Sequence, residues 1–333
     1  MTAKHFGVAA IAFAMAACGH DGDKAGGAEG ATGSRRSALE QGTSVTIPWG
    51  EGSGGLGFRA RVTEETEGAA LGVPAVAVGR GGVYLLDALH GRVARLEGDT
   101  LTTVASVPVD ADDLAIGPDG AFAVRRSVKP EVLVFGPDGA PAGAVDTSAV
   151  EVVSTITLGR SRQVFAQNGF QETFAFGSPS MPQLAGQVLA GKREGAAFLP
   201  AGQGLVAVRT ETGELELRSV YALGRESAQR KGLAETVALG KGSAARIVGT
   251  SGNVACLRLE AVTQDATGAL VTSREAACVD VAAGKIVLRT KLPPPGTYVP
   301  RRELAFAGNT LVFARPSESG LEVSTWKVPG AAR

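Results

Sequence analysis

The chain is a succession of short apolar or alternating runs, each closed by glycine, proline, asparagine or aspartate, and few folds accommodate this pattern. The first four such runs are 75–78, 83–86, 92–96 and 101–107. Helical spacing is scarce from residue 43 onward, so the pattern predicts an all-β chain. The 46 glycines show no Gly-X-Y period, which excludes collagen and fits many tight turns.

This four-strand unit recurs along the chain, with first strands near 75, 113, 154, 196, 246 and 303. Glycine–proline–aspartate–glycine turns at 117–120 and 136–139 suit tight reversals, because proline fixes φ and glycine accepts a positive φ. The last unit offers only three strands, and the run 44–47 can supply the fourth. The sequence therefore predicts a six-bladed β-propeller with four-stranded antiparallel blades, closed by an N-terminal strand.

One unit also resembles a repeat of the NHL family of propellers. The matching segments are Pro74-Ala75-Val76-Ala77-Val78, Gly82-Val83-Tyr84-Leu85-Leu86-Asp87 and His90-Gly91-Arg92-Val93. In that family an aspartate after the second strand and a following arginine brace each blade, so the resemblance implies this role for Asp87 and Arg92. The second unit has Arg125 where the aspartate would stand. Relatives of the family include metal-dependent lyases with histidine ligands, and this chain lacks those histidines.

The first 42 residues predict export. Residues 1–17 combine Lys4 with an apolar run too short to span a bilayer, as in a secretory signal peptide. Met15-Ala16-Ala17-Cys18 resembles a bacterial lipobox, which implies lipidation of Cys18; the alternative is a plain signal peptide cut near Ala17. Gly19 stands where an inner-membrane retention aspartate would be, which favours the outer membrane. Residues 18–42 are a glycine-rich tether, and 43–330 form the propeller domain.

Two cysteines remain, and both fall in the middle strands of the fifth unit. Facing Cys256 with Cys278 in an antiparallel hairpin also places Glu260 opposite Arg274. A disulfide between them is our prediction, with two free thiols as the alternative. We expect no metal or other cofactor, because no histidine is near these thiols in sequence.

Few residues suggest chemistry, and we assign no catalytic residue. His90 is the one histidine of the propeller domain and reads as a turn residue beside Asp87. Residues 110–113 alternate as calcium loops do, but solvated loop charge is the preferred interpretation. Possible ligand contacts are the acids Asp112 and Asp113, the arginines Arg125, Arg126, Arg301 and Arg302 at a channel entrance for a carboxylate or sugar acid, and Tyr298 presented outward by a proline-rich loop.

The balance of 33 basic and 33 acidic residues argues against a nucleic-acid partner. The leading hypothesis is a lipid-anchored envelope propeller that binds or scaffolds a protein or a polysaccharide, with the membrane contacted through the anchor. The alternative is a carboxylate-dependent propeller hydrolase acting on a glycan at the channel mouth, which would need two carboxyl groups about 5 to 9 Å apart. A third hypothesis, an element of a larger envelope machine, predicts apolar side chains gathered on one face.

Overall fold

The computed structural model describes residues 42–60, 71–183, 193–194, 196–199, 204–220 and 236–331. The chain divides into two units, 1–37 and 38–333. The predicted signal peptide, Cys18 and all of the tether except its last residue lie outside the described residues. Within the described part no helix is long and apolar enough to cross a membrane.

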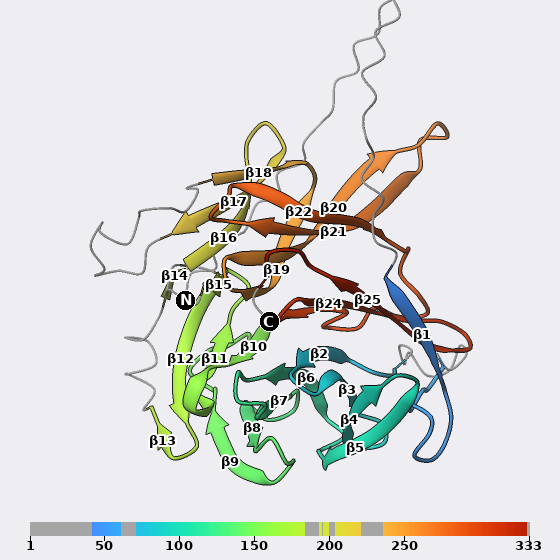
Figure 1. Cartoon of the computed structure of the whole chain (residues 1–333), viewed down its shortest axis with the longest axis vertical. Coiled ribbons are helices and arrows are strands. Elements are labelled where there is room, and N and C mark those ends of the chain that lie inside the picture. Colours follow the sequence, from blue (N-terminus) through green and yellow to red (C-terminus); the bar gives the residue numbers. More distant parts are fainter. Residues whose placement is uncertain are drawn as a thin grey trace, which may run out of the picture. The chain divides into compact units, whose positions relative to one another are not determined.

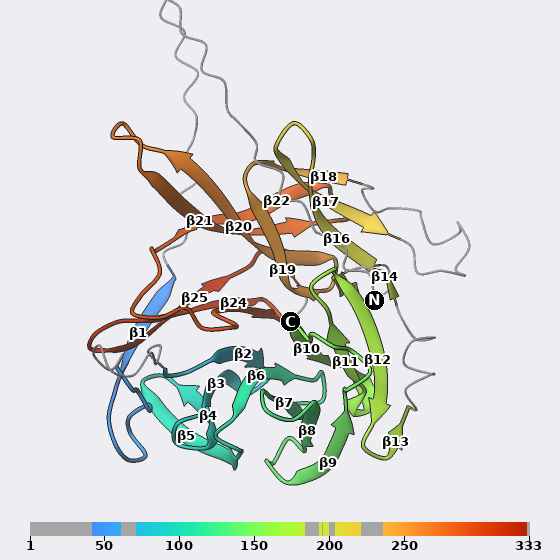
Figure 2. The same ribbon diagram turned by 180° about the vertical axis from the view of Figure 1, so that it is seen from behind.

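Six antiparallel sheets follow one another around a ring (Figures 1 and 2). Blade 1 contains β2 (Ala75–Gly79), β3 (Gly82–Asp87), β4 (Arg92–Glu97) and β5 (Thr100–Ser106). Blade 2 contains β6 (Ala111–Ile116), β7 (Phe122–Arg126), β8 (Glu131–Phe135) and β9 (Pro141–Asp146). Blade 3 contains β10 (Thr155–Leu158), a 3-10 turn η1 (Arg160–Arg162), β11 (Val164–Gln167), β12 (Glu172–Ser178), β13 (Met181–Pro182) and β14 (Arg193–Glu194).

The second half of the ring repeats the order. Blade 4 contains β15 (Ala197–Phe198), β16 (Gly204–Arg209), β17 (Glu214–Val220) and β18 (Thr236–Lys241). Blade 5 contains β19 (Ala244–Ser251), β20 (Val254–Gln264), β21 (Leu270–Asp280) and β22 (Lys285–Leu292). Blade 6 contains β23 (Leu304–Ala307), β24 (Thr310–Pro316), β25 (Gly320–Lys327) and, from the other end of the chain, β1 (Thr43–Pro48).

The predicted six-bladed propeller and its closure are confirmed. Strand β1 pairs with β25 in antiparallel register, with Val45 opposite Val323 and Ile47 opposite Leu321. The outer part of blade 3 differs from the expected single strand at 187–189, which lies outside the described residues. Two short strands, β13 and β14, instead pair with opposite ends of β12.

The alternation of strand direction gives the ring two distinct faces. Connections between blades, and those between the second and third strands of a blade, lie at the end where inner strands begin. We call this side the loop face. Inner strands of different blades begin there together, since Arg302, just before β23, bonds to Asp113 near the start of β6 and to Thr155 of β10. The remaining connections, including the two Gly-Pro-Asp-Gly turns, form the turn face.

The core lies between adjacent blades and consists mainly of alanine, valine and leucine. Between blades 5 and 6 it includes the predicted disulfide, which is confirmed: Cys256 and Cys278 are bonded. They face each other in the expected register, with Glu260 opposite Arg274. Both cysteines are fully buried, so the bond is part of the interface between two blades.

Candidate functional site

A charged network crosses the axis of the ring on the loop face, and its centre is Asp113, whose exposed fraction is 1%. The Arg302 guanidinium donates from Nε to Asp113 Oδ1 at 2.7 Å and from Nη2 to Oδ2 at 2.8 Å. The same Nη2 donates to the Ile156 carbonyl at 2.8 Å and to the Thr155 hydroxyl. Because blades 3 and 6 stand opposite each other in a ring of six, this contact joins opposite sides of the propeller.

The neighbouring carboxylate, Asp112, is held by two other arginines. Arg125 donates from Nε to Asp112 Oδ1 at 2.9 Å and from Nη2 to Oδ2. Arg301 Nη1 lies 3.4 Å from the same Oδ2, and its Nη2 donates to the carbonyls of Val153 and Ser154. The expected solvated loop charge at 110–113 is therefore wrong for Asp112 and Asp113, because arginines from distant parts of the chain bury them.

The two aspartates differ in acidity. Burial opposes ionisation of Asp113, but Arg302 outweighs it and holds the pKa of this carboxyl below its usual value. For Asp112 burial prevails over Arg125, and the nearby Asp113 adds to it, so the pKa is raised. Both carboxylates face guanidinium groups rather than open space. This arrangement braces the channel mouth and leaves neither group positioned to transfer a proton to a substrate.

A second charged cluster, which sequence reasoning missed, lies between blades 5 and 6. Glu303, 4% exposed, accepts from Arg258 Nη1 at 2.9 Å and from Arg274 Nη1 at 2.8 Å. The guanidinium of Arg274 also lies over the ring of Phe313, 5.8 Å from its centroid. Although Glu260 and Arg274 face each other as predicted, Glu260 pairs with Arg258. The only sequence signal for this cluster is the run of three charged residues at 301–303.

The pair that the NHL resemblance singled out forms a separate anchor. Arg92 Nε donates to Asp87 Oδ2 at 2.8 Å, and the Gly57 amide donates to Oδ1 at 3.0 Å. Arg92 also donates to the carbonyls of Ser53 and Gly55. These bonds attach the glycine-rich segment that follows β1 to blade 1. His90 Nδ1 lies 2.8 Å from Asp87 Oδ2, so the histidine belongs to the same anchor.

Two other predicted contacts lie elsewhere. Arg126 bonds to Asp110 at 3.0 Å and to Glu131 at 2.7 Å, on blade 2, and not with Arg125. The prediction that Tyr298 is presented outward is wrong. Its ring stacks on Phe58 at 6.2 Å between centroids, its hydroxyl donates to the Val73 carbonyl, and burial raises its pKa.

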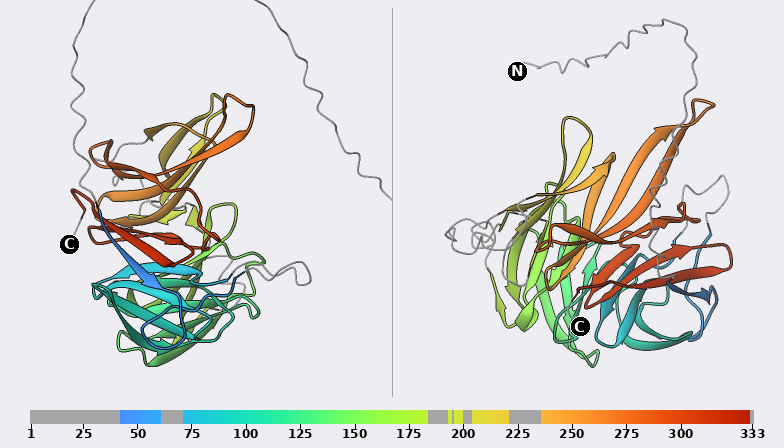
Figure 3. Two further views of the ribbon diagram at one scale, coloured as in Figure 1. Left: turned by 90° about the vertical axis from the view of Figure 1, so that its right-hand side faces the viewer. Right: turned by 45° about the horizontal axis from the view of Figure 1, so that its top comes forward.

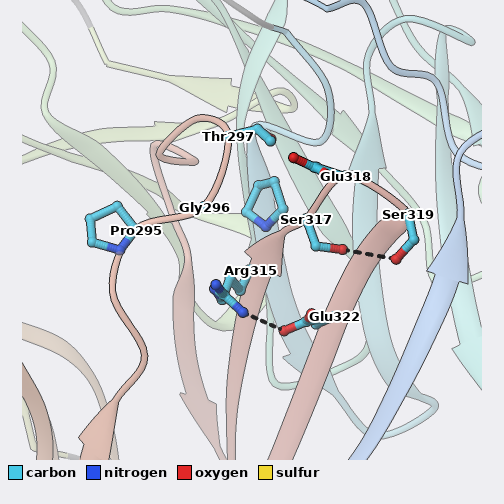
Figure 4. A pocket seen from close by; sticks show the side chains of 9 residues that line it. Pro295, Gly296, Thr297, Arg315, Ser317, Glu318, Ser319 and Glu322 are labelled. Carbon is cyan, nitrogen blue, oxygen red and sulfur yellow. Dashed lines mark hydrogen bonds and ion pairs between the residues drawn. The ribbon is translucent and has the colours of Figure 1, made fainter.

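The proline-rich connection that contains Tyr298 instead borders an open pocket of about 600 Å³ (Figure 4). Its lining comes from this connection and from the β24–β25 connection, both on the loop face. Within it Arg315 pairs with Glu322 at 3.0 Å, and the hydroxyls of Ser317 and Ser319 lie 3.3 Å apart. Because its charges are mutually neutralised, the pocket offers a ligand mainly hydroxyl groups and proline surface.

Exposed apolar side chains are concentrated on the loop face. Of the ten large exposed apolar residues in the described part of the chain, nine lie in loop-face connections or in the β20–β21 hairpin that ends there. They are Leu71, Val109, Val128, Val152, Phe170, Val262, Leu270, Val271 and Val299. The tenth, Met181, lies on the turn face. The hairpin extends well beyond its neighbouring strands (Figure 3).

Among the described residues, no group of three or more histidine, cysteine, aspartate or glutamate side chains is arranged to hold a metal ion. The fold and this loop face place the protein among the β-propellers. No family model matches the chain, so membership of the NHL family is not shown. No curated protein matches it either.

Several solved structures are similar over most of the chain. Virginiamycin B lyase from Staphylococcus aureus is 12% identical, with a TM-score of 0.37 over 79% of this chain and 86% of that chain. The PQQ-bound aldose sugar dehydrogenase from Streptomyces coelicolor is 11% identical, with a TM-score of 0.43 over 86% and 98%. At these scores the propeller assignment rests on strand pairing in this chain, and no activity carries over from these proteins.

Proposed function

We propose that the protein is an exported, lipid-anchored propeller of the cell envelope whose loop face binds another protein. The observation that carries this proposal is the distribution of exposed apolar side chains, nine of which lie on one face and one on the other. Exposed apolar surface costs solubility, and its concentration on one face is typical of an interaction surface. A uniform scatter would have had no such meaning.

A protein suits this face better than a polysaccharide. Sugar sites typically use aromatic platforms, whereas Phe170, 87% exposed, is the one aromatic residue among the large exposed apolar side chains of the described part. Trp49 and Tyr298 both stack on Phe58. The remaining exposed side chains are aliphatic, as in the apolar part of a protein interface.

The hydrolase alternative gains no support from the axial carboxylates. Asp112, Asp113 and Glu303 converge near the axis, as that hypothesis required, but each is bonded to one or more arginines. A glycosidase acid must be free to meet the glycosidic oxygen.

Export rests on the leader and on the disulfide. Residues 1–17 have the signal-peptide pattern, and Cys18 follows small residues. The buried Cys256–Cys278 bond fits an oxidising compartment. Gly19 favours the outer membrane.

The test is crosslinking and pull-down of the anchored protein from its own cells, followed by affinity measurement with the captured partner. We expect Phe170→Ser or Leu270→Ser to weaken binding about tenfold or more, as loss of an apolar anchor does. The matched control is Met181→Ser, which removes a side chain of similar exposure from the opposite face. Equal effects of all three variants, or no effect of the loop-face pair, would contradict the proposal. Capture of a polysaccharide instead of a protein would also overturn it.

A further inference from the structure

Three arginines lie on one face of blade 5, the face that packs against blade 6. Arg246 of β19 is directly opposite Arg258 of β20, and Arg258 is opposite Ala276 of β21, two residues from Arg274. Directly paired residues of an antiparallel sheet project to the same side. The like-charged pair Arg246–Arg258 is therefore unfavourable unless negative charge lies nearby.

The available carboxylates serve only the outer two arginines. Glu303 binds Arg258 and Arg274, and Glu260 lies 3.1 Å from Arg258. Among the described residues Arg246 has neither an ion pair nor a hydrogen bond. Its surroundings instead contain Arg302, Arg258 and Arg301. Desolvation by nearby protein, together with these cations, lowers the pKa of Arg246.

Across both clusters positive charge exceeds negative charge. The six guanidinium groups are Arg125, Arg246, Arg258, Arg274, Arg301 and Arg302, against the four carboxylates Asp112, Asp113, Glu260 and Glu303. Three buried donors, the Nε atoms of Arg258, Arg274 and Arg301, have no acceptor. A buried donor without an acceptor is costly and indicates an absent oxygen.

We propose that Arg246 is the main contact of an oxyanion-binding site at the axial end of blade 5, which takes a carboxylate or phosphate group. Arg246 is exposed to solvent, so an anion can reach it, and the planar fork of a guanidinium binds either group through two hydrogen bonds. Arg302 and Arg301 add attraction without losing their own partners. The Arg125, Arg301 and Arg302 forks, which the sequence suggested for such a ligand, are already bonded to protein groups.

Calorimetry and thermal unfolding of the full-length protein, at constant ionic strength, test the site with acetate and with inorganic phosphate against chloride. We expect one of these oxyanions to bind and to raise the unfolding temperature. Arg246→Gln should weaken that binding at least tenfold. The matched control is Arg80→Gln, because Arg80 is exposed on the turn face and should leave the affinity unchanged. The anion with the larger effect identifies the ligand chemistry.

A second readout separates a binding role from a structural one. In chloride alone Arg246→Gln should unfold at a higher temperature than the wild type, because it removes like-charge repulsion and loses no bond. A lower unfolding temperature would show that Arg246 supports the fold and would overturn the proposal. So would equal oxyanion responses of the wild type and Arg246→Gln, or no response of the wild type to either oxyanion. None of these outcomes bears on whether the loop face binds a protein.

Discussion

The axial pair of Asp113 and Arg302 should be among the most costly polar contacts to break in this protein. Asp113→Ala leaves the Arg302 guanidinium with two lost hydrogen bonds and also removes the acceptor of the Ile156 amide, 2.9 Å away. Removing one partner of a buried ion pair costs about 3 to 5 kcal/mol. Since the Arg302 side chain is 18% exposed, water can compensate part of the loss, and we expect about 2 to 4 kcal/mol.

The assay is urea unfolding of the wild type and Asp113→Ala, followed by circular dichroism. Glu97→Gln is the control, because the Arg95–Glu97 pair has side chains 35% and 55% exposed and should contribute no more than about 1 kcal/mol. The double variant Asp113→Ala/Arg302→Met should recover part of the loss, since no buried charge then remains unpaired. A loss below about 1 kcal/mol for Asp113→Ala would refute the argument, because water would then be screening the pair.

The pH dependence follows from the same contact. The pKa of Asp113 is lower in the folded protein than its usual value of about 3.9. Its contribution to the free energy of unfolding is therefore fully present above about pH 4 and is lost as the pH falls through the folded-state pKa. We expect the difference in stability between the wild type and Asp113→Ala to narrow below about pH 4. A difference that widens in acid would contradict this sign.

Three further predictions concern the fold and its anchor. Replacing Cys256 and Cys278 by alanine should cost about 3 kcal/mol in urea unfolding, because the bond closes a loop of 22 residues; a cost near zero would contradict this. Gly139→Ala should cost about 2 kcal/mol or more by the same assay, since φ is +84° and a Cβ would clash with the Val104 carbonyl; Gly98→Ala, with open space around it, should cost less. Cys18→Ala should abolish membrane fractionation, and unchanged fractionation would refute the lipid anchor.

The charged clusters show what local sequence could not predict. Asp113 lies 189 residues from Arg302, and Arg258 lies 45 residues from Glu303. Each of these residues looks like a solvated charge near a strand end, because its own neighbours in sequence offer no partner. Tyr298 was misread for the same reason: the stiffness of its proline-rich segment is local, whereas the Phe58 ring that covers it comes from the other end of the chain.

The strands, the six-blade order, the closing strand and the facing cysteines were readable from the sequence, because strand alternation and turn residues act over a few neighbouring positions. The register of Cys256 with Cys278 needed only a hairpin between adjacent strands. Closure of the ring brought residues from opposite blades to one axis, and only that closure decided which arginine meets which carboxylate. It also gathered the apolar connections on one face and left Arg246 without a partner among the described residues. Both features depend on distances in space that the order of residues does not encode.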